Sequence, residues 1–448
     1  MIELSLGELP RACGGTWQGN LELLREHVSG IVTDSRQVEE GSLFIAFRGE
    51  KVDGHRFIPD VLSHGAMAVL CEEPGKPGEP RIIVPHVMDA LRQIALYNRS
   101  RLRFPFVGIT GSVGKTTAKE MTAAVLSARF RTFKTPGSMN GQIGVPIAFM
   151  SMSSDYEAAV IEMGVSQFGE MTRLTEIVQP DYAVFTNIGD AHLEFLHDRA
   201  GVLRAKSEIL KGMKNDAVVF ANGDDALLRT ADFQRKTVLF GLGENCQVRA
   251  TDIRYEPTKI SCQIVAGERS FPVTVPGYGG YMIYSVLSAA AVGMEMGLSD
   301  EEIARGLLSF SNVGHRSRIV QTPLCTLIDD CYNANPTSND AAIDSMKNLP
   351  GRKVCILGDM REMGETSAQL HRELGLYAVA HGVDLVLTEG DEARYISEAA
   401  GEKGIHFPSR EALLSALPGL IQKDDVVLVK ASRGAHFENV VDVIEKMK

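Results

Sequence analysis

The stretch TGSVGKTTAKEM, from Thr110 to Met121, indicates which kind of fold this sequence encodes. It follows a short apolar run, FVGIT, and leads into residues typical of a helix. A strand, a glycine loop, a Lys-Thr pair and a helix in this order are typical of a phosphate-binding loop, because the amides at the start of the helix point at phosphate oxygens. The strict pattern G-x-x-x-x-G-K-[ST] is not met, because Ile109 stands where the first glycine belongs.

Each polar group of this loop has an expected role. Lys115 is placed to neutralise the β- and γ-phosphates of a nucleotide, and the Thr116 hydroxyl to hold Mg²⁺. The alternative is a glycine turn followed by a solvated lysine, which the flanking strand and helix make much less favourable. We therefore expect ATP to be bound by Gly111, Ser112, Gly114, Lys115, Thr116 and Thr117.

The composition excludes several classes of protein. The chain has 448 residues, enough for two to four domains, and its net charge of −11 argues against nucleic-acid binding. It contains no apolar run of roughly 20 residues and no recognisable signal peptide, so we expect no membrane insertion. Seven cysteines are scattered singly, which is typical of reduced, buried thiols in a cytoplasmic protein.

Short strands alternate with helices along most of the chain, which predicts an α/β protein of three domains. Runs such as AAVIEM, YAVFTN and AVVFAN predict a parallel sheet of the kind found in P-loop ATPases. Runs such as KVCILGD, DLVLTEG and DVVLVKAS predict a second open sheet, Rossmann-like in style. We predict a small N-terminal α/β domain (residues 1–99), a central domain (residues 100–313) and a C-terminal Rossmann-like domain (residues 314–448).

Polar side chains follow successive strands of the predicted central sheet. Glu162 ends one strand, Asp190 and His192 follow the next, and Lys206 lies on a helix soon after. The carboxyl ends of parallel strands meet at one edge of a sheet, so these residues are expected to converge over the phosphates. Glu162 and His192 are then candidate Mg²⁺ ligands. Taken alone, Glu162 could equally be a surface carboxylate, and His192 a histidine whose hydrogen bonds are all made within the protein.

Several separated motifs together resemble the Mur ligase family, whose members build the peptide of the bacterial cell-wall precursor. They are TGSVGKTT, EMG, TNIGDAHLE, AKSEI, DDCYNANP and GDMREMG, and the resemblance extends from TDSR near the start to KASR near the end. The family's loop has the form T-G-x-x-G-K-T, which needs no glycine at position 109. DDCYNANP and GDMREMG most resemble the members that join D-alanyl-D-alanine to a UDP-N-acetylmuramoyl-tripeptide through an acyl phosphate.

The resemblance also implies roles for individual residues. Lys206 stands where the family carries a carbamylated lysine that binds a second Mg²⁺, so Lys115, Glu162, His192 and Lys206 form the implied catalytic set. Ser35 and Arg36 of TDSR stand where the family holds the UDP end of its substrate. In the third domain the residues implied to face the nucleotide are Arg316, which reaches ATP across the domain boundary, Asp330, which binds the ribose, and Tyr332, Asn333 and Asn335.

The sequence departs from the family pattern in two places. The family usually has two asparagines before GVP, whereas here the predicted substrate residue Asn140 is followed by Gly141. The family also has a histidine and an asparagine that meet adenine, where this sequence has Tyr281 and Ser285. A tyrosine ring can stack on a purine, whereas serine offers fewer hydrogen bonds than asparagine.

The expected partners are therefore ATP, Mg²⁺, a UDP-N-acetylmuramoyl-tripeptide and D-alanyl-D-alanine, acted on by a cytoplasmic monomer. Two alternatives stay open. One is a related ligase that adds another amino acid or dipeptide. The other is a nucleotide-binding module that has lost ligation, which the changes at Tyr281 and Ser285 leave room for.

Overall fold

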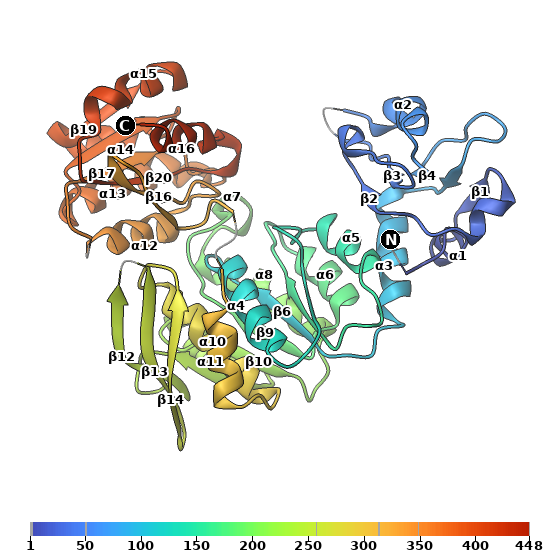
Figure 1. Cartoon of the computed structure of the whole chain (residues 1–448), viewed down its shortest axis with the longest axis horizontal. Coiled ribbons are helices and arrows are strands. Elements are labelled where there is room, and N and C mark those ends of the chain that lie inside the picture. Colours follow the sequence, from blue (N-terminus) through green and yellow to red (C-terminus); the bar gives the residue numbers. More distant parts are fainter. Residues whose placement is uncertain (1–2, 50–51, 257, 312–313, 348, 448) are drawn as a thin grey trace.

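The computed structural model describes residues 3–49, 52–256, 258–311, 314–347 and 349–447. It contains three separate β-sheets that follow one another along the chain, each covered by its own helices (Figure 1). The three-domain α/β architecture that the sequence predicts is thus confirmed. The predicted boundary at residue 313 lies outside the described residues.

The N-terminal domain is built on a five-stranded sheet in the order β1-β5-β4-β3-β2, in which only β1 runs antiparallel to its neighbour. Its core also takes in Ile147 and Met150, which belong to a helix of the central domain. The elements are α1 (Glu8–Cys13), β1 (Thr16–Gln18), β2 (Ile31–Val32), β3 (Leu43–Ile45), α2 (Ile58–Ser63), β4 (Ala68–Cys71), β5 (Arg81–Ile83) and α3 (Val87–Arg99).

The central domain has a nine-stranded sheet in the order β14-β13-β12-β11-β10-β9-β6-β8-β7. The strands from β7 to β12 are parallel, and β12, β13 and β14 form an antiparallel extension. The strands are β6 (Phe106–Thr110), β7 (Thr132–Lys134), β8 (Ala158–Glu162), β9 (Tyr182–Phe185), β10 (Val218–Asn222), β11 (Lys236–Gly241), β12 (Val248–Glu256), β13 (Lys259–Ala266) and β14 (Arg269–Pro276).

Helices cover both faces of the parallel part of this sheet, because its strands are apolar on both faces. Val107 and Ile109 of β6 pack on one side and Phe106 on the other, so the strand is entirely buried. The helices are α4 (Lys115–Ser127), α5 (Gly144–Met150), α6 (Glu170–Val178), α7 (Leu193–Leu196), α8 (Arg199–Ser207), α9 (Ala226–Thr230), α10 (Met282–Glu295) and α11 (Asp300–Leu308).

The C-terminal domain has a six-stranded sheet in the order β15-β16-β20-β17-β18-β19, parallel except for the edge strand β15. The strands are β15 (Arg318–Gln321), β16 (Cys325–Asp329), β17 (Lys353–Leu357), β18 (Leu385–Glu389), β19 (Gly404–Phe407) and β20 (Asp425–Lys430). The helices are α12 (Pro336–Met346), α13 (Ser367–Ala380), α14 (Arg394–Ala400), α15 (Arg410–Leu420) and α16 (Glu438–Glu445).

A side chain of the central domain is part of the core of the C-terminal domain. Tyr278 lies in the loop between β14 and α10, is 6% exposed and packs among buried residues of the third domain such as Met346. Its hydroxyl donates a hydrogen bond to the carbonyl of Ser345 in α12. The loop that continues to Tyr281 is therefore fastened to the third domain.

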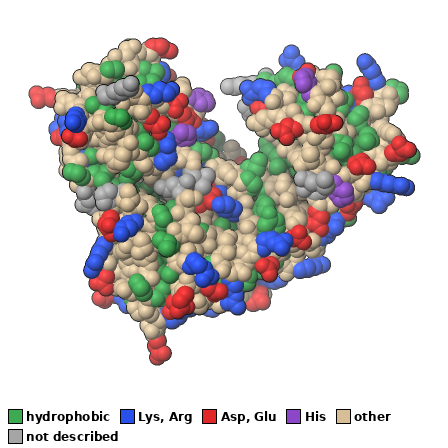
Figure 2. Space-filling view, in the orientation of Figure 1, with side chains coloured by type: hydrophobic (Ala, Val, Ile, Leu, Met, Phe, Trp, Pro, Cys, Tyr) green, Lys and Arg blue, Asp and Glu red, His purple; other side chains and the backbone are tan. Residues whose placement is uncertain are grey.

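The two outer domains stand on either side of a hollow above the central domain. Figure 1 shows the N-terminal and C-terminal domains apart from each other, and Figure 2 shows the open notch between them. All seven cysteines are buried and none forms a disulfide, as the sequence predicts. None of the helices within the described ranges combines the length and apolar character needed to cross a bilayer.

Candidate functional site

The loop between β6 and α4 is held in one conformation by the segment that follows β9. Gly111 has φ +146°, and a Cβ at this position would lie 1.9 Å from Thr186 Oγ1, so no larger residue fits. The amide of Ser112 donates to the Asn187 carbonyl (3.0 Å), and the amide of Val113 donates to Asn187 Oδ1 (2.9 Å). The loop is thus preformed for a ligand at the start of α4.

Lys115 curls back over this loop. Its Nζ donates to the carbonyls of Gly111 (2.8 Å) and Ser112 (3.2 Å). Burial lowers the pKa of Lys115 to about 8, with the nearby Glu162 opposing the shift and Arg316 adding to it. A phosphate at this place would supply the negative charge that the ammonium lacks here.

Glu162 ends β8 with its side chain 1% exposed. Thr116 Oγ1 donates to its Oε2 at 2.9 Å, and Asn140 Nδ2 donates to its Oε1 at 2.8 Å. The structure therefore brings together three residues singled out in the sequence, and it places a hydroxyl and a carboxylate oxygen side by side next to the phosphate loop.

His192 has a left-handed backbone (φ 56°) and precedes α7. Its Nδ1 is hydrogen-bonded to the carboxylate of Glu362, which belongs to the third domain, and this contact lowers the pKa of Glu362. His192 therefore contacts a neighbouring domain as well as lining the site.

Lys206 lies on α8 and is 1% exposed. Among the described residues its ammonium has no hydrogen bond or ion pair. Burial, reinforced by the positive charge of Lys115, lowers its pKa well below the usual lysine value. A buried and unpartnered lysine favours the neutral amine, which contrasts with the solvated helix lysine that composition alone would suggest.

The third domain contributes two groups that face the loop. Arg316 lies over the ring of Tyr332, with its guanidinium carbon 3.8 Å from the ring centroid. Asp330 accepts hydrogen bonds from the amide and hydroxyl of Ser317 (2.9 and 3.2 Å) and from the ammonium of Lys430. Lys430 is 3% exposed, so the Asp330 carboxylate is held in place by a buried cation.

These groups line one cavity of about 570 Å³ between the central and third domains. This volume lies within the range of about 300–1,000 Å³ that is typical of small-molecule sites. The sequence-predicted residues that line it are Ser112, Gly114, Lys115, Thr116, Thr117, Asn140, Glu162, His192, Tyr281, Arg316, Asp330, Tyr332, Asn333 and Asn335. Those that do not are Gly111, Lys206, Ser285, Ser35 and Arg36.

Tyr281 and Ser285 line an adjoining cavity of about 430 Å³, together with Asn222 and Asp224. Val113 belongs to the lining of both cavities, so the second opens directly beside the phosphate loop. Burial and the neighbouring carboxylate of Asp330 raise the pKa of Tyr281, which keeps its hydroxyl neutral. The cavity offers an aromatic ring and polar side chains beside the phosphate loop.

Ser35 and Arg36 lie in the N-terminal domain, outside both cavities. Arg36 is exposed and its guanidinium is held by Asp34, with 2.6 Å between Nη2 and Oδ2. The structure thus does not bring these two residues together with the other predicted site residues, and a ligand that contacts both sets must cross the notch visible in Figure 2.

Asn335 has a structural task that the sequence analysis did not assign to it. Its Oδ1 accepts from the Ser338 amide (2.9 Å), and the Asn335 amide donates to Ser338 Oγ (3.0 Å), which closes a reciprocal cap at the start of α12. The Asn-Pro pair at 335–336 is a recognisable signal for such a helix start.

Reasoning from the sequence also missed Lys119, Glu362, Lys430 and Arg433. Glu362 lies inside the motif GDMREMG, yet nothing in that motif shows that the residue contacts His192. The guanidinium carbon of Arg433, like that of Arg316, lies near the Tyr332 ring, at 5.3 Å from its centroid. Glu362 has its partner in the central domain, whereas Lys119, Lys430 and Arg433 have theirs on other segments of their own domain.

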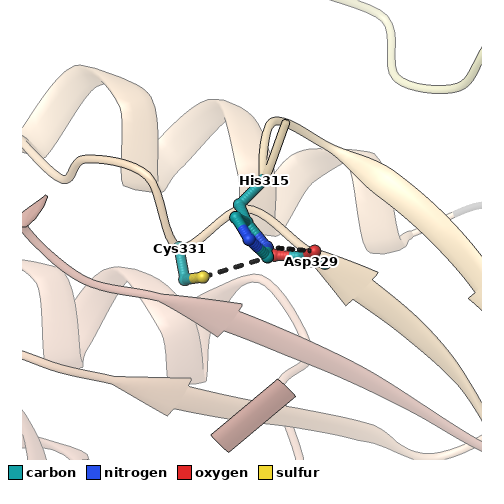
Figure 3. Close-up of side chains that lie close together, drawn as sticks. All are labelled: His315, Asp329 and Cys331. Carbon is teal, nitrogen blue, oxygen red and sulfur yellow. Dashed lines mark hydrogen bonds and ion pairs between the residues drawn. The ribbon is translucent and has the colours of Figure 1, made fainter. Parts of the chain in front are cut away.

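One cluster has the residue types of a metal site. His315 Nδ1 lies 2.8 Å from Asp329 Oδ2, and the Cys331 thiol donates to Asp329 Oδ1 at 3.3 Å (Figure 3). Arg318 also donates to Asp329 Oδ2, from Nε at 3.1 Å and from Nη2 at 3.0 Å. The guanidinium of Arg318 supplies the positive charge that a metal cation would bring. Burial raises the pKa of the Cys331 thiol, which disfavours the thiolate that binds metals. The cluster therefore has a structural role, in which it links β15 to β16.

Comparisons with known proteins extend over the whole chain. Three family models match it: "Mur ligase family, catalytic domain" over residues 27–99, "Mur ligase middle domain" over residues 109–293, and "Mur ligase, glutamate ligase domain" over residues 315–433. A UDP-N-acetylmuramoyl-tripeptide–D-alanyl-D-alanine ligase from Bacillus subtilis is 35% identical, with 99% of each chain covered. The enzyme of that name from Escherichia coli is 34% identical, with 100% of this chain and 99% of the relative covered.

Solved structures give the same picture. A crystal structure of MurF from Acinetobacter baumannii superposes with a TM-score of 0.89 at 31% identity, covering 99% of this chain and 100% of that one. MurF from Thermotoga maritima in complex with ADP superposes with a TM-score of 0.82, also at 31% identity, covering 93% and 97%.

Proposed function

The chain belongs to the Mur ligase family, and we propose that it uses ATP to join D-alanyl-D-alanine to a UDP-N-acetylmuramoyl-tripeptide, a step in the synthesis of peptidoglycan precursors. The observation that supports this reaction most strongly is the cavity between the second and third domains. It combines a preformed phosphate loop, the ammonium of Lys115, the buried carboxylate of Glu162 and the guanidinium of Arg316.

In this reaction the terminal carboxylate of the tripeptide attacks the γ-phosphate of ATP, which gives an acyl phosphate and ADP. The amine of the dipeptide then attacks the acyl carbon, and inorganic phosphate leaves. Negative charge accumulates on the transferring phosphoryl group, and fixed cations aimed at it lower the barrier. Lys115 from the loop and Arg316 from the third domain are the cationic side chains of the cavity that we assign to this task.

The third domain also orients the nucleotide in this proposal. Asp330 is assigned to the ribose hydroxyls, because Lys430 and Ser317 already fix the carboxylate. Tyr281 and Ser285 are assigned to the base, and Tyr332, Asn333 and Asn335 to the remaining nucleotide-facing surface. Closure of the domains around the substrates would exclude water from the acyl phosphate.

The oxygen atoms near the loop suit Mg²⁺, which prefers hard oxygen ligands. Thr116 Oγ1 and Glu162 Oε2 lie 2.9 Å apart at the edge of the cavity, so we assign the nucleotide-bound ion to them, with Asn140 orienting the carboxylate. When bound, the ion neutralises charge on the β- and γ-phosphates.

We assign a second ion to His192 and to a carbamylated Lys206. Lys206 suits this modification, because a neutral and unpartnered amine is the form that reacts with carbon dioxide, and the product is an anion beside Lys115. His192 keeps one ring nitrogen for Glu362, so only the other is available.

The N-terminal domain, proposed as residues 1–99, is assigned to the UDP end of the acceptor through Ser35 and Arg36. Residues 100–313 and 314–448 are the proposed ATP-binding and third domains. We propose a monomer as the working unit. Seven reduced thiols and nucleotide-linked substrates support the cytoplasm as its location.

A phosphate-release assay tests the proposal. The purified protein is offered ATP, Mg²⁺, UDP-N-acetylmuramoyl-tripeptide and D-alanyl-D-alanine, and each substrate is omitted in turn. Phosphate release that requires both acceptor and dipeptide, with the UDP-pentapeptide product seen by mass spectrometry, is the expected result. Release with a different amine would indicate a related ligase, and nucleotide binding without any release would indicate a module that has lost ligation.

A further inference from the structure

A buried lysine that does not line the cavity contacts Glu162 and the loop at residues 135–140. Lys119 is on the second turn of α4 and its side chain is 0% exposed. Its Nζ donates to the carbonyls of Thr135 (2.9 Å) and Gly137 (2.7 Å). Lysine is almost never fully buried unless its charge is paired, so this position demands an explanation.

Two buried carboxylates provide the pairing. Lys119 Nζ lies 3.0 Å from Glu120 Oε1 and 3.8 Å from Glu162 Oε2. The other oxygen of Glu120 is bound by Lys134, whose side chain is 49% exposed. Glu162, in contrast, lines the cavity, whereas Lys119 does not, so Lys119 reaches this carboxylate from the protein interior.

The segment that Lys119 holds by its carbonyls is the same segment that orients the site. Thr135 Oγ1 accepts from the amide of Glu162 at 3.0 Å, and Asn140 donates to the Glu162 carboxylate. Between them, Ser138 Oγ accepts from Arg316 of the third domain at 3.1 Å. The ammonium of Lys119, which belongs to the helix after the phosphate loop, therefore contacts both the loop at residues 135–140 and the carboxylate of Glu162.

We propose that Lys119 is a positioning residue that holds Glu162 and the loop at residues 135–140 in the arrangement that receives the nucleotide-bound Mg²⁺. The inference rests on the proposed function only in taking Glu162 as an ion ligand. Lys119 acts through Glu162 and touches neither nucleotide nor substrate.

The test is the effect of Mg²⁺ on ADP binding, measured by calorimetry with Mg²⁺ and again with EDTA. Lys119→Met keeps the length of the side chain and removes its charge. We expect the variant to lose about 10- to 100-fold of the ADP affinity measured with Mg²⁺, the range typical of groups that orient metal ligands, and to match the parent in EDTA. Loss of affinity by the same factor in EDTA, or full retention of the Mg²⁺ effect, would overturn the proposal.

Lys134→Met is the matched control, because it removes a cation from Glu120 and leaves Glu162 untouched. It should keep the parental Mg²⁺ effect, and a loss equal to that of Lys119→Met would assign the effect to Glu120 and refute our inference. If Lys119→Met does not fold, Lys119→Met/Glu120→Gln is measured in its place, with the same two outcomes, because it also removes the negative charge of one of the two carboxylates that Lys119 contacts.

Failure of the proposed function is recognised separately. A parent protein that binds ADP with Mg²⁺ but does not join the tripeptide to the dipeptide would disprove the ligation, while the comparison of Lys119→Met with Lys134→Met would still decide the role of Lys119.

Discussion

Arg316 of the third domain donates a hydrogen bond to Ser138 of the central domain, with 3.1 Å between Nη2 and Oγ. The same guanidinium lies over the Tyr332 ring, with 3.8 Å between its carbon and the ring centroid, so its position is also supported from within its own domain. A second bridge joins His192 to Glu362. The central and third domains are therefore already in contact around the phosphate loop, whereas the notch separates the N-terminal domain from the third domain (Figure 2).

Replacing Lys115 by alanine should abolish ligation and leave the protein folded. The side chain bonds only to two loop carbonyls, so little packing is lost, whereas a cation aimed at the phosphoryl group is removed. We expect turnover to fall by at least about 10²-fold. Lys214→Ala, at a largely exposed lysine, is the control. Parental turnover, or a variant that is unfolded at room temperature, would contradict this role.

Lys206 should carry a carbamate, and Lys206→Ala should be largely inactive. Protein equilibrated with ¹³C-bicarbonate should give a ¹³C NMR signal for the carbamate that is absent from the variant. Short-chain carboxylates should restore part of the variant's activity by standing in for the missing anion. A parent protein without the signal, together with a fully active variant, would refute the modification.

Tyr281→Ala should raise the KM for ATP about three- to tenfold and leave kcat nearly unchanged. A stacked ring contributes about 0.5–1.5 kcal/mol beyond the area it buries, which corresponds to this range. The phosphates remain bound by the loop, so the chemical step is spared. Tyr281→Phe separates the ring from the hydroxyl, which lies near Ser317 and Asp330: a silent change assigns the effect to stacking. An unchanged KM in Tyr281→Ala would leave the base without this partner.

Asp340 on α12 should make stability depend on pH. Burial and the nearby Asp344 raise its pKa to about 6, so the folded state disfavours the ionised form that the unfolded state adopts above pH 4. The destabilisation is therefore full above pH 6 and disappears as the pH falls towards 4. Asp340→Asn should increase the free energy of unfolding by about 2–3 kcal/mol at pH 7.5 and progressively less down to pH 4.

Urea denaturation at several pH values measures this difference. Asp391→Asn, at an exposed aspartate of the same domain, should show no pH-dependent gain. If Asp340→Asn were stabilised equally at pH 4 and pH 7.5, the negative charge of Asp340 would not be what destabilises the folded state.

The sequence predicted well those parts of the site that depend on local order along the chain. The apolar run FVGIT forms β6 and a helix follows the glycine loop, as the sequence predicts, because the hydrophobic pattern and the loop glycines specify both. Glu162 ends β8 as the sequence predicts, whereas His192 lies farther on, between the end of β9 and the start of α7. Both line the same cavity, since parallel strands deliver their carboxyl ends to one edge.

What the sequence could not predict depends on contacts between distant segments. A buried lysine such as Lys119 looks, in sequence, like the exposed lysines around it, and only the carboxylates of other elements explain it. The pairing of His192 with Glu362 spans two domains, and the edge strand β15 is too short and polar to stand out. The Asn335 cap is a different case, because its Asn-Pro signal was present.

Tyr278, Ile147 and Met150 make it difficult to cut this protein into separately stable domains. Each side chain belongs to the central stretch of chain yet fills the core of a neighbour. A fragment that starts at residue 314 would have a hole where the phenol ring belongs and a Ser345 carbonyl without its donor. A fragment that stops at residue 99 would expose the apolar surface that α5 covers. Expressed alone, both outer pieces should aggregate or melt early, and mixing them with the missing middle piece should rescue them.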